Sequence, residues 1–181
     1  SKKHNNQIQH PGYWKNNPNL YANEKLYPYI NPKNKPFIWT QGKQLGGRSL
    51  TWGGITLRLA PSDFNSSLDD GFGPNWPITY DDLSMHYDYI ENFNGIYGKK
   101  DNIKQVPDGN YIGEISLTNS EKYFGDQIKS KLNYPFIQSR GFDRNSSIRE
   151  KDWPKSSSIG SSLKKAIETG NVQILSNHLV E

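Results

Sequence analysis

Two pairs of adjacent glycines form the clearest candidate for a ligand site in this sequence. Gly46-Gly47 and Gly53-Gly54 begin seven residues apart, and residues without a Cβ let a ligand approach backbone N–H groups closely. The first pair, with the Ser49 hydroxyl as a further donor, suits a pyrophosphate. Trp52, beside the second pair, supplies an apolar wall for a flat ring. The spacing therefore indicates an elongated, phosphate-bearing cofactor.

A purely structural role explains the same glycines. Five of the sixteen glycines fall between Gly42 and Gly54, beside Leu, Ile and Trp instead of the Ser, Asn and Asp that are typical of a solvent-exposed loop. This setting predicts that the glycines are buried. A buried glycine-rich turn that packs a helix against a strand is therefore the alternative to a cofactor site.

A larger set of residues around the glycines matches a known pattern. Its members are the run Gly42–Gly54, then Arg58, Asp63-Phe64, Trp76-Pro77, Tyr80, Asp82-Leu83, Tyr87, Glu91 and Gly95, and later Ala166–Leu175 with Val180. With these residues the chain resembles the glucose–methanol–choline (GMC) family of flavin-dependent oxidoreductases, most closely its bacterial branch of sugar and gluconate dehydrogenases. The resemblance is good over about residues 36–98, moderate over 140–181 and poor between 99 and 139.

The resemblance implies that the chain binds FAD through three groups of residues. They match the family's contacts to the pyrophosphate and ribityl chain, to the isoalloxazine ring and to the adenine, and are respectively Gly46, Gly47 and Ser49; Trp52, Gly53 and Gly54; and Val180. Thr51 stands where some members carry a histidine bonded covalently to the flavin, so the resemblance implies noncovalent FAD. Arg48 replaces a smaller or sulfur-bearing residue and could neutralise phosphate or face solvent.

The implied fold is α+β, as part of the two-lobed GMC architecture with much irregular structure. Residues 1–40 are expected to form an irregular arm rich in Pro, Asn and aromatic rings, and the resemblance implies that residues 41–60 contact FAD. It further implies that residues 61–170 belong to the substrate domain and that residues 171–181 form a strand that returns to the FAD-binding domain. The implied reaction oxidises the CH–OH group of an alcohol or sugar by hydride transfer to flavin N5, with an electron-acceptor protein as partner in a dehydrogenase.

Two hallmarks of the family are missing from this sequence. We expect the dinucleotide fingerprint G-x-G-x-x-G ahead of Ser1 and the catalytic histidine beyond Glu181. The four histidines of the chain, His4, His10, His86 and His178, are predicted to be solvated or structural. No residue here is therefore assigned a catalytic role or a metal, and we expect the chain alone to be inactive, as the central part of a longer enzyme.

Local signals predict three helices. The strongest runs from Thr79, a favoured N-cap with Asp82 three residues on, to Gly95 at the position of a C-terminal cap. Further helices are expected over about 119–133, although Gly125 weakens that helix, and over about 161–169, ended by Gly170.

Two short strands are predicted. Ile55, Leu57 and Leu59 alternate with polar residues, so we expect a strand whose apolar side chains are buried. The second strand is expected over 171–177.

Composition excludes several classes of protein. With no cysteine, the chain can form neither disulfides nor thiolate-ligated metal sites. A mean hydropathy of −0.88 and the lack of a long apolar run exclude a transmembrane segment. The net charge of +4 is scattered, which does not favour nucleic-acid binding. The compartment stays open.

Two other functions remain open. The aromatic content of 13% and the incomplete catalytic set are compatible with a non-enzymatic carbohydrate-binding module. A truncated, inactive member of the GMC family is the other alternative.

Overall fold

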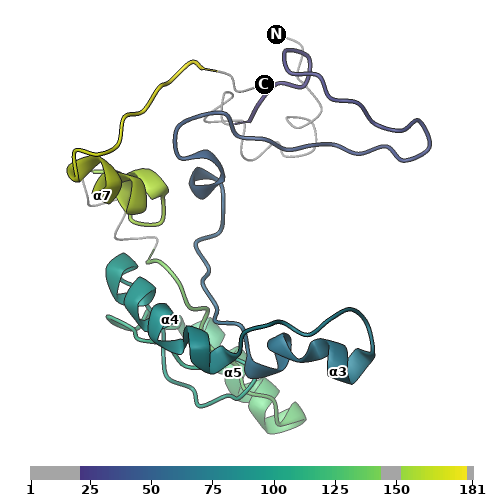
Figure 1. Cartoon of the computed structure of the whole chain (residues 1–181). Coiled ribbons are helices and arrows are strands. Elements are labelled where there is room, and N and C mark those ends of the chain that lie inside the picture. The colour runs from purple at the N-terminus through teal and green to yellow at the C-terminus, as the bar shows by residue number, and fades with distance from the viewer. Residues whose placement is uncertain (1–20, 144–151, 179–181) are drawn as a thin grey trace. The chain divides into compact units, whose positions relative to one another are not determined.

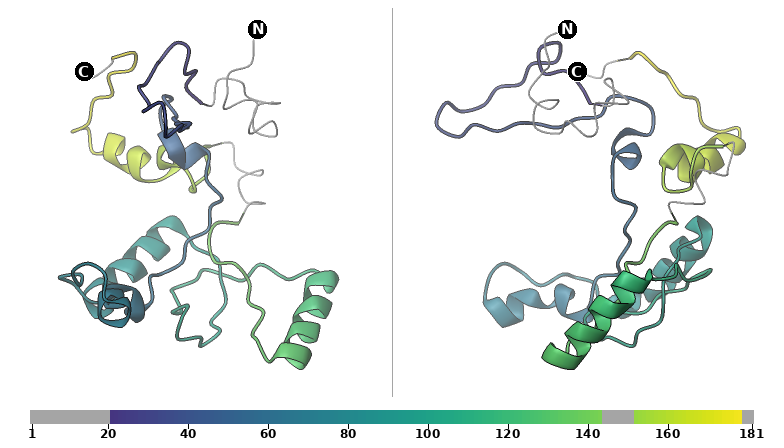
Figure 2. Two further views of the ribbon diagram at one scale, coloured as in Figure 1. Left: turned by 90° about the vertical axis from the view of Figure 1, so that its right-hand side faces the viewer. Right: turned by 180° about the vertical axis from the view of Figure 1, so that it is seen from behind.

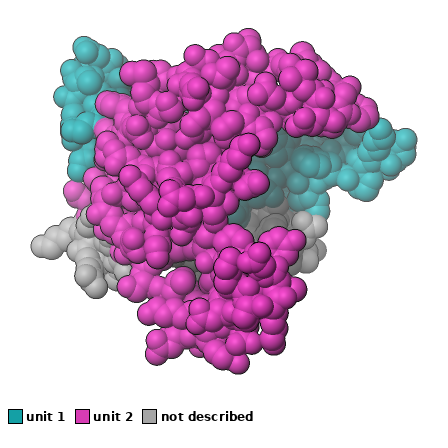
Figure 3. All heavy atoms as spheres, turned by 90° about the horizontal axis from the view of Figure 1, so that it is seen from below, with its two compact units in different colours: residues 1–52, 157–181 teal, residues 53–156 magenta. Residues whose placement is uncertain are grey.

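The computed structural model describes residues 21–143 and 152–178 (Figure 1). The chain divides into two compact units, which Figure 3 shows in different colours. Unit 1 consists of Ser1–Trp52 and Ser157–Glu181, and unit 2 of Gly53–Ser156. Val180, the predicted adenine contact, lies outside the described residues.

Unit 2 contains the longest helices of the described chain, and local capping sets their ends. Helix α4 covers Tyr80–Asn94, and helix α5 covers Asn119–Leu132. At the start of α4 the Thr79 hydroxyl accepts a hydrogen bond from the Asp82 amide, while the Asp82 carboxylate accepts one from the Thr79 amide. Gly95 ends the helix in the left-handed conformation at φ 70°. Both helices are thus confirmed where the sequence predicts them.

The cap of α5 has the same form. Thr118 caps the helix together with Glu121, and Asn133 ends it at φ 54°. The other helical turns of unit 2 are short: the 3-10 helix η2 covers Pro61–Phe64, and α3 covers Ser66–Asp70. Figure 2, left, shows α4 and α5 on opposite sides of a group of extended segments.

The extended segments of unit 2 pair through isolated bridges. Gly141 bridges to Ile55 on one side and to Tyr97 on the other, both antiparallel, and Tyr97 also bridges to Gly113. Four segments that are far apart in the sequence therefore lie side by side in the order 55, 141, 97 and 113. Since pairing among the described residues is limited to such bridges, the α+β fold stays a prediction.

Burial at residues 55–60 is the reverse of the prediction. Ile55, Leu57 and Leu59 are exposed, whereas Arg58 and Ala60 are buried. The physical reason is that Arg58 forms an ion pair with Glu91 of α4 inside unit 2, which turns the apolar alternate positions outward. The expected buried apolar face is therefore wrong.

Polar groups make up much of the core of unit 2. Phe64 and Ile96 are its most deeply buried apolar side chains, each 2% exposed, and Phe64 packs edge to face on Trp76. Arg140, at 1% exposure, is buried at least as deeply as either of them. Buried arginines, each hydrogen-bonded to several acceptors, thus occupy core positions that aliphatic residues usually fill.

Unit 1 has two short 3-10 helices and one α-helix in its described part. They are η1 (Gly47–Leu50), η3 (Ser158–Gly160) and α7 (Ser162–Glu168). Helix α7 confirms the third predicted helix, with Gly170 in the left-handed region after it. Residues 171–177, predicted as a strand, form an irregular segment without strand pairing in the described chain. That prediction is wrong because a strand needs a neighbouring strand for its backbone hydrogen bonds, and residues 171–177 have none among the residues that the structure describes.

Within the described ranges, the helices are all too short or too polar to cross a membrane.

Candidate cofactor site

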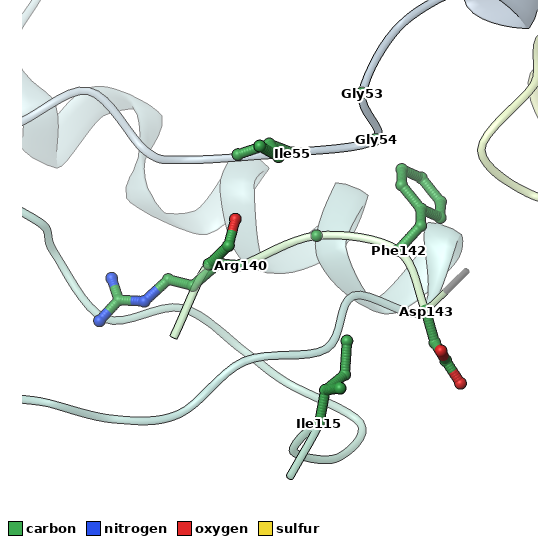
Figure 4. A pocket seen from close by; sticks show the side chains of 9 residues that line it. Gly53, Gly54, Ile55, Ile115, Arg140, Phe142 and Asp143 are labelled. Carbon is green, nitrogen blue, oxygen red and sulfur yellow. The ribbon is translucent and has the colours of Figure 1, made fainter. Parts of the chain in front are cut away.

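The second glycine pair lines a cleft in unit 2. The cleft has a volume of about 400 Å³ and lies between two extended segments and a third stretch of chain. Gly53, Gly54 and Ile55 form one side, and residues 139–143 and Ile115 form the others (Figure 4). Two of the predicted isoalloxazine contacts are therefore lining residues of a cleft.

Backbone hydrogen bonds join the first two sides of the cleft. The Thr56 amide donates to the carbonyl oxygen of Arg140 over 2.8 Å, and the Phe142 amide donates to that of Gly54 over 2.9 Å. Gly54 has φ 71°, a conformation that L side chains rarely adopt. Glycine is favoured here by the backbone conformation and not by crowding, because an added Cβ would meet Phe142 only at an ordinary contact distance of 3.8 Å.

Three side chains determine which surfaces of the cleft are apolar and which are charged. The Phe142 ring points toward the Gly53–Gly54 backbone, and Ile115 lies below it from a different stretch of the chain (Figure 4). Asp143 follows Phe142 and points the other way (Figure 4). The cleft thus combines apolar surfaces with one carboxylate, a pattern typical of small-molecule sites.

The first glycine pair lies in unit 1, at the start of η1. Gly46 and Gly47 both have positive φ, 88° and 49°. A Cβ on Gly46 would come within 3.0 Å of the Ile159 side chain, so this glycine allows close packing inside unit 1. A Cβ on Gly47 would meet nothing within 4 Å. The structural alternative therefore accounts for Gly46, whereas Gly47 faces open space.

Ser49 is engaged within unit 1. Its hydroxyl donates to the Gly46 carbonyl over 2.5 Å, and it accepts the Ser158 amide over 2.9 Å. The expected role as a free donor to phosphate would require this arrangement to open. In this conformation Ser49 fastens η1 to η3.

Two main-chain N–H groups at the start of η1 have no backbone acceptor in the described chain. The Gly47 amide donates to Gln44 and the Ser49 amide to Gly46. The amides of Gly46 and Arg48 have no such partner among the described residues. The Arg48 guanidinium, which could have neutralised phosphate, instead donates to the Thr40 carbonyl over 3.1 Å.

The predicted site residues divide between the two units. Unit 1 holds Gly46, Gly47, Ser49 and Trp52, and unit 2 holds Gly53 and Gly54. The prediction that the glycines of this run are buried is wrong: Gly53 is exposed and the others are half-buried. Burial fails because their neighbours Leu45, Trp52 and Ile55 are themselves exposed.

Several residues of the GMC-like pattern form a buried ion cluster. The Arg58 guanidinium donates from Nε and Nη2 to the two carboxylate oxygens of Glu91, over 2.9 and 2.5 Å. Nη2 also reaches Asp88 over 2.6 Å, and Nη1 reaches the Tyr80 hydroxyl over 3.2 Å. The hydrogen bonds to Glu91 raise the pKa of Arg58 above its ordinary value, against the effect of burial. This part of the pattern therefore stabilises unit 2, through contacts distinct from the cleft.

A second arginine organises the loop of residues 99–108. Arg140 Nη1 donates to the carbonyls of Val106 and Pro107, over 2.8 and 2.6 Å. Nη2 donates to the carboxylates of Asp108 and Asp101, over 2.7 and 3.3 Å. Burial acts to raise the pKa of Asp108, but hydrogen bonds from the Asp101 and Asn102 amides and the charge of Arg140 outweigh it and lower the pKa. Arg140 thus fixes the loop through main-chain and side-chain acceptors together.

The residues on the far side of the cleft were not predicted. Phe142, Asp143, Ile115 and Arg140 lie 60 to 90 residues beyond the glycines in the chain, and part of that region matches the family pattern poorly. The pairing of Gly141 with Ile55 is a long-range contact, for which local sequence gives no signal.

Two of the four histidines lie in the described chain. His86 and His178 are exposed, as predicted for solvated residues, and His4 and His10 lie outside the described residues. In residues 21–143 and 152–178, no three acidic or histidine side chains gather in a way that could hold a metal ion.

Thr51, at the position of the flavin-linked histidine of some GMC members, has its hydroxyl engaged locally. The hydroxyl donates to the Arg48 carbonyl over 3.1 Å.

Neither a scan against protein-family models nor a search of curated proteins finds a match to this sequence.

Proposed function

We propose that this chain is part of an FAD-dependent oxidoreductase that oxidises the CH–OH group of an alcohol or a sugar. One observation carries the proposal. Gly53 and Gly54, which the GMC resemblance assigns to the isoalloxazine ring, line the cleft of about 400 Å³ in unit 2. The resemblance and the cleft are independent of each other, because the cleft is defined by packing alone.

The residues at the cleft fit a flat ring. Gly53 and Gly54 present main chain without a side chain, and a Cβ built on Gly53 would meet only the tip of Ile55 at 4.0 Å. Phe142 and Ile115 supply apolar surfaces that exclude water from a bound ring. FAD, when bound, would supply the hydride acceptor for the oxidation.

The first glycine pair is the proposed phosphate contact. Successive main-chain N–H groups attract anions, and the amides of Gly46 and Arg48 have no partner in the described part of unit 1. Ser49 keeps these amides in place by fastening η1 to Ser158. Thr51 stands where some family members carry the histidine that is bonded to the flavin. Because threonine cannot form that bond, FAD is bound noncovalently, and denaturation should release it from the polypeptide.

The test compares two glycine variants in the protein encoded by the complete reading frame. Gly54→Ala and Gly73→Ala introduce the same side chain at nearly the same φ, 71° and 74°. Only Gly54 lines the cleft; a Cβ on Gly73 meets nothing within 4 Å. FAD binding is measured by the quenching of flavin fluorescence, and dye reduction is measured with a panel of alcohols and sugars.

We expect the unaltered protein to bind FAD and to reduce the dye with at least one substrate. Gly54→Ala should weaken FAD binding by about tenfold, which corresponds to about 1.4 kcal/mol, and Gly73→Ala should leave it unchanged. A colourless protein that binds no FAD would refute the proposal.

A carbohydrate-binding module is the second candidate, favoured by the exposure of large rings. Trp39, Trp76 and Trp153 are each more than half exposed, and exposed rings can stack on sugars. This function predicts heat of binding with soluble oligosaccharides in calorimetric titration, both with and without FAD. Sugar binding that requires no flavin, in a protein that binds no flavin, would favour the module over the oxidoreductase.

A further inference from the structure

Of the three glycines that line the cleft, Gly141 has the least room for a side chain. A Cβ built on this residue would overlap the carbonyl oxygen of Gly54 and lie 3.0 Å from the Ile55 Cα. Contacts of this kind to main chain cannot be relieved by rotating a side chain. The backbone of Gly54 can therefore occupy its position only because residue 141 has no side chain.

Gly141 is also held from its other side. Its amide donates to the Tyr97 carbonyl over 2.9 Å, and the Tyr97 amide donates back to the Gly141 carbonyl over 2.7 Å. The antiparallel bridges on both sides leave residue 141 no room to move away from Gly54. Any added volume at Gly141 must consequently displace the glycine pair or break the bridge to Tyr97.

Arg140, the residue before Gly141, anchors the same segment through both its side chain and its main chain. Its side chain is 1% exposed, and its guanidinium is bound by Asp101, Asp108 and the carbonyls of the 99–108 loop. Its own carbonyl accepts the Thr56 amide. The side chain thus fixes the segment to the loop, while the main chain of the same residue holds the extended segment that follows the second glycine pair.

We infer that Arg140 and Gly141 are positioning residues for the cofactor cleft, which set the main chain of Gly53 and Gly54 against the bound flavin ring. This inference rests on the proposed function. It adds two residues that the sequence pattern does not assign, and both act through the backbone of Gly54 and the residues that follow it. Figure 4 shows the Arg140 side chain directed away from Phe142 and Asp143.

The principal test is Gly141→Ala in the protein encoded by the complete reading frame. We expect FAD binding to weaken by about tenfold or more, with a changed visible absorption spectrum of the flavin that remains bound. Hydrogen exchange at the Thr56 and Phe142 amides, measured without FAD, should accelerate relative to the amides of α4, because both donate across the displaced contact.

Two controls separate positioning from loss of stability. Gly73→Ala adds the same atom at a positive φ away from the cleft. Phe64→Leu destabilises unit 2 by reducing a core side chain that is 2% exposed. Both controls should bind FAD as the unaltered protein does and leave its spectrum unchanged.

Should Gly141→Ala fail to fold, Arg140→Lys provides the test, since it retains Gly141 and the buried positive charge but loses the planar set of donors. Wild-type FAD affinity and an unchanged spectrum in whichever variant folds would overturn the inference and leave the proposed function standing. A wild-type protein that binds no FAD would instead overturn the proposed function, and the inference with it.

Discussion

Replacing Glu91 by alanine should destabilise unit 2 far more than removing any single exposed acid. The carboxylate of Glu91 is buried and binds both Nε and Nη2 of Arg58, whose side chain is 6% exposed. It also accepts the Asn110 amide over 2.6 Å. The alanine variant therefore leaves a buried guanidinium and a backbone donor without their main acceptor.

The expected magnitude follows from these contacts. Breaking a buried ion pair by removing one partner costs about 3–5 kcal/mol, and losing the acceptor of one amide costs about 1 kcal/mol. Arg58 retains Asp88 and the Tyr80 hydroxyl, which places the sum near its lower end, at about 4 kcal/mol. That is a large share of the roughly 5–15 kcal/mol that stabilises a typical domain.

Urea unfolding followed by far-ultraviolet circular dichroism measures the loss. Asp88→Ala is the matched control, because Asp88 binds the same arginine with a side chain that is 54% exposed. An exposed partner should cost less than about 1 kcal/mol. The double variant Arg58→Met with Glu91→Met should recover most of the stability, because it removes both buried charges together. A Glu91→Ala variant as stable as Asp88→Ala would refute this account of the core.

Three further predictions concern the caps and the first glycine pair. Hydrogen bonds from the Thr79 and Thr118 backbones lower the pKa values of Asp82 and Glu121 below the ordinary 3.8 and 4.5, so each carboxylate stabilises its helix above its ordinary pKa and loses that contribution as the pH falls through the lowered value. Helical circular dichroism should therefore decline in acid, and a protein carrying both Asp82→Asn and Glu121→Gln should show a shallower decline; equal slopes would contradict the capping geometry. Ser49→Ala should cost about 1 kcal/mol and accelerate hydrogen exchange at both η1 and η3, whereas exchange confined to η1 would show that the bond to Ser158 does not form. Gly47→Ala should cost about 1–2 kcal/mol from its left-handed backbone alone and Gly47→Asn less, as urea midpoints would show; equal costs would indicate a steric contact that the structure does not contain.

The helices could be predicted from the sequence because their signals are local. Thr79, Asp82 and Gly95 each act within one turn of a helix end, and the structure has α4 between them. The burial of residues 55–60 could not be predicted in the same way. It depends on Arg58 reaching Glu91, a residue 33 positions away, and hydrophobic alternation alone assigns the buried face to the wrong side chains.

The candidate site was predictable on one side only. Glycine spacing and the GMC resemblance point to Gly53 and Gly54, which line the cleft. The opposite side, with Phe142 and Ile115, comes from segments whose pairing is decided by three-dimensional contacts. Gly141 is the clearest example, since the sequence gives no sign that its missing side chain makes room for the carbonyl of Gly54.

The way Arg140 holds the 99–108 loop affects how this protein can diverge. Three of its acceptors are the carbonyl oxygens of Lys99, Val106 and Pro107, and every amino acid supplies a carbonyl oxygen. Random substitution at these three positions should therefore preserve the loop's path, while a library at Arg140, Asp101 or Asp108 should return few folded clones. The loop can accumulate new surface chemistry without a change of shape, which makes it a natural place to graft foreign peptides.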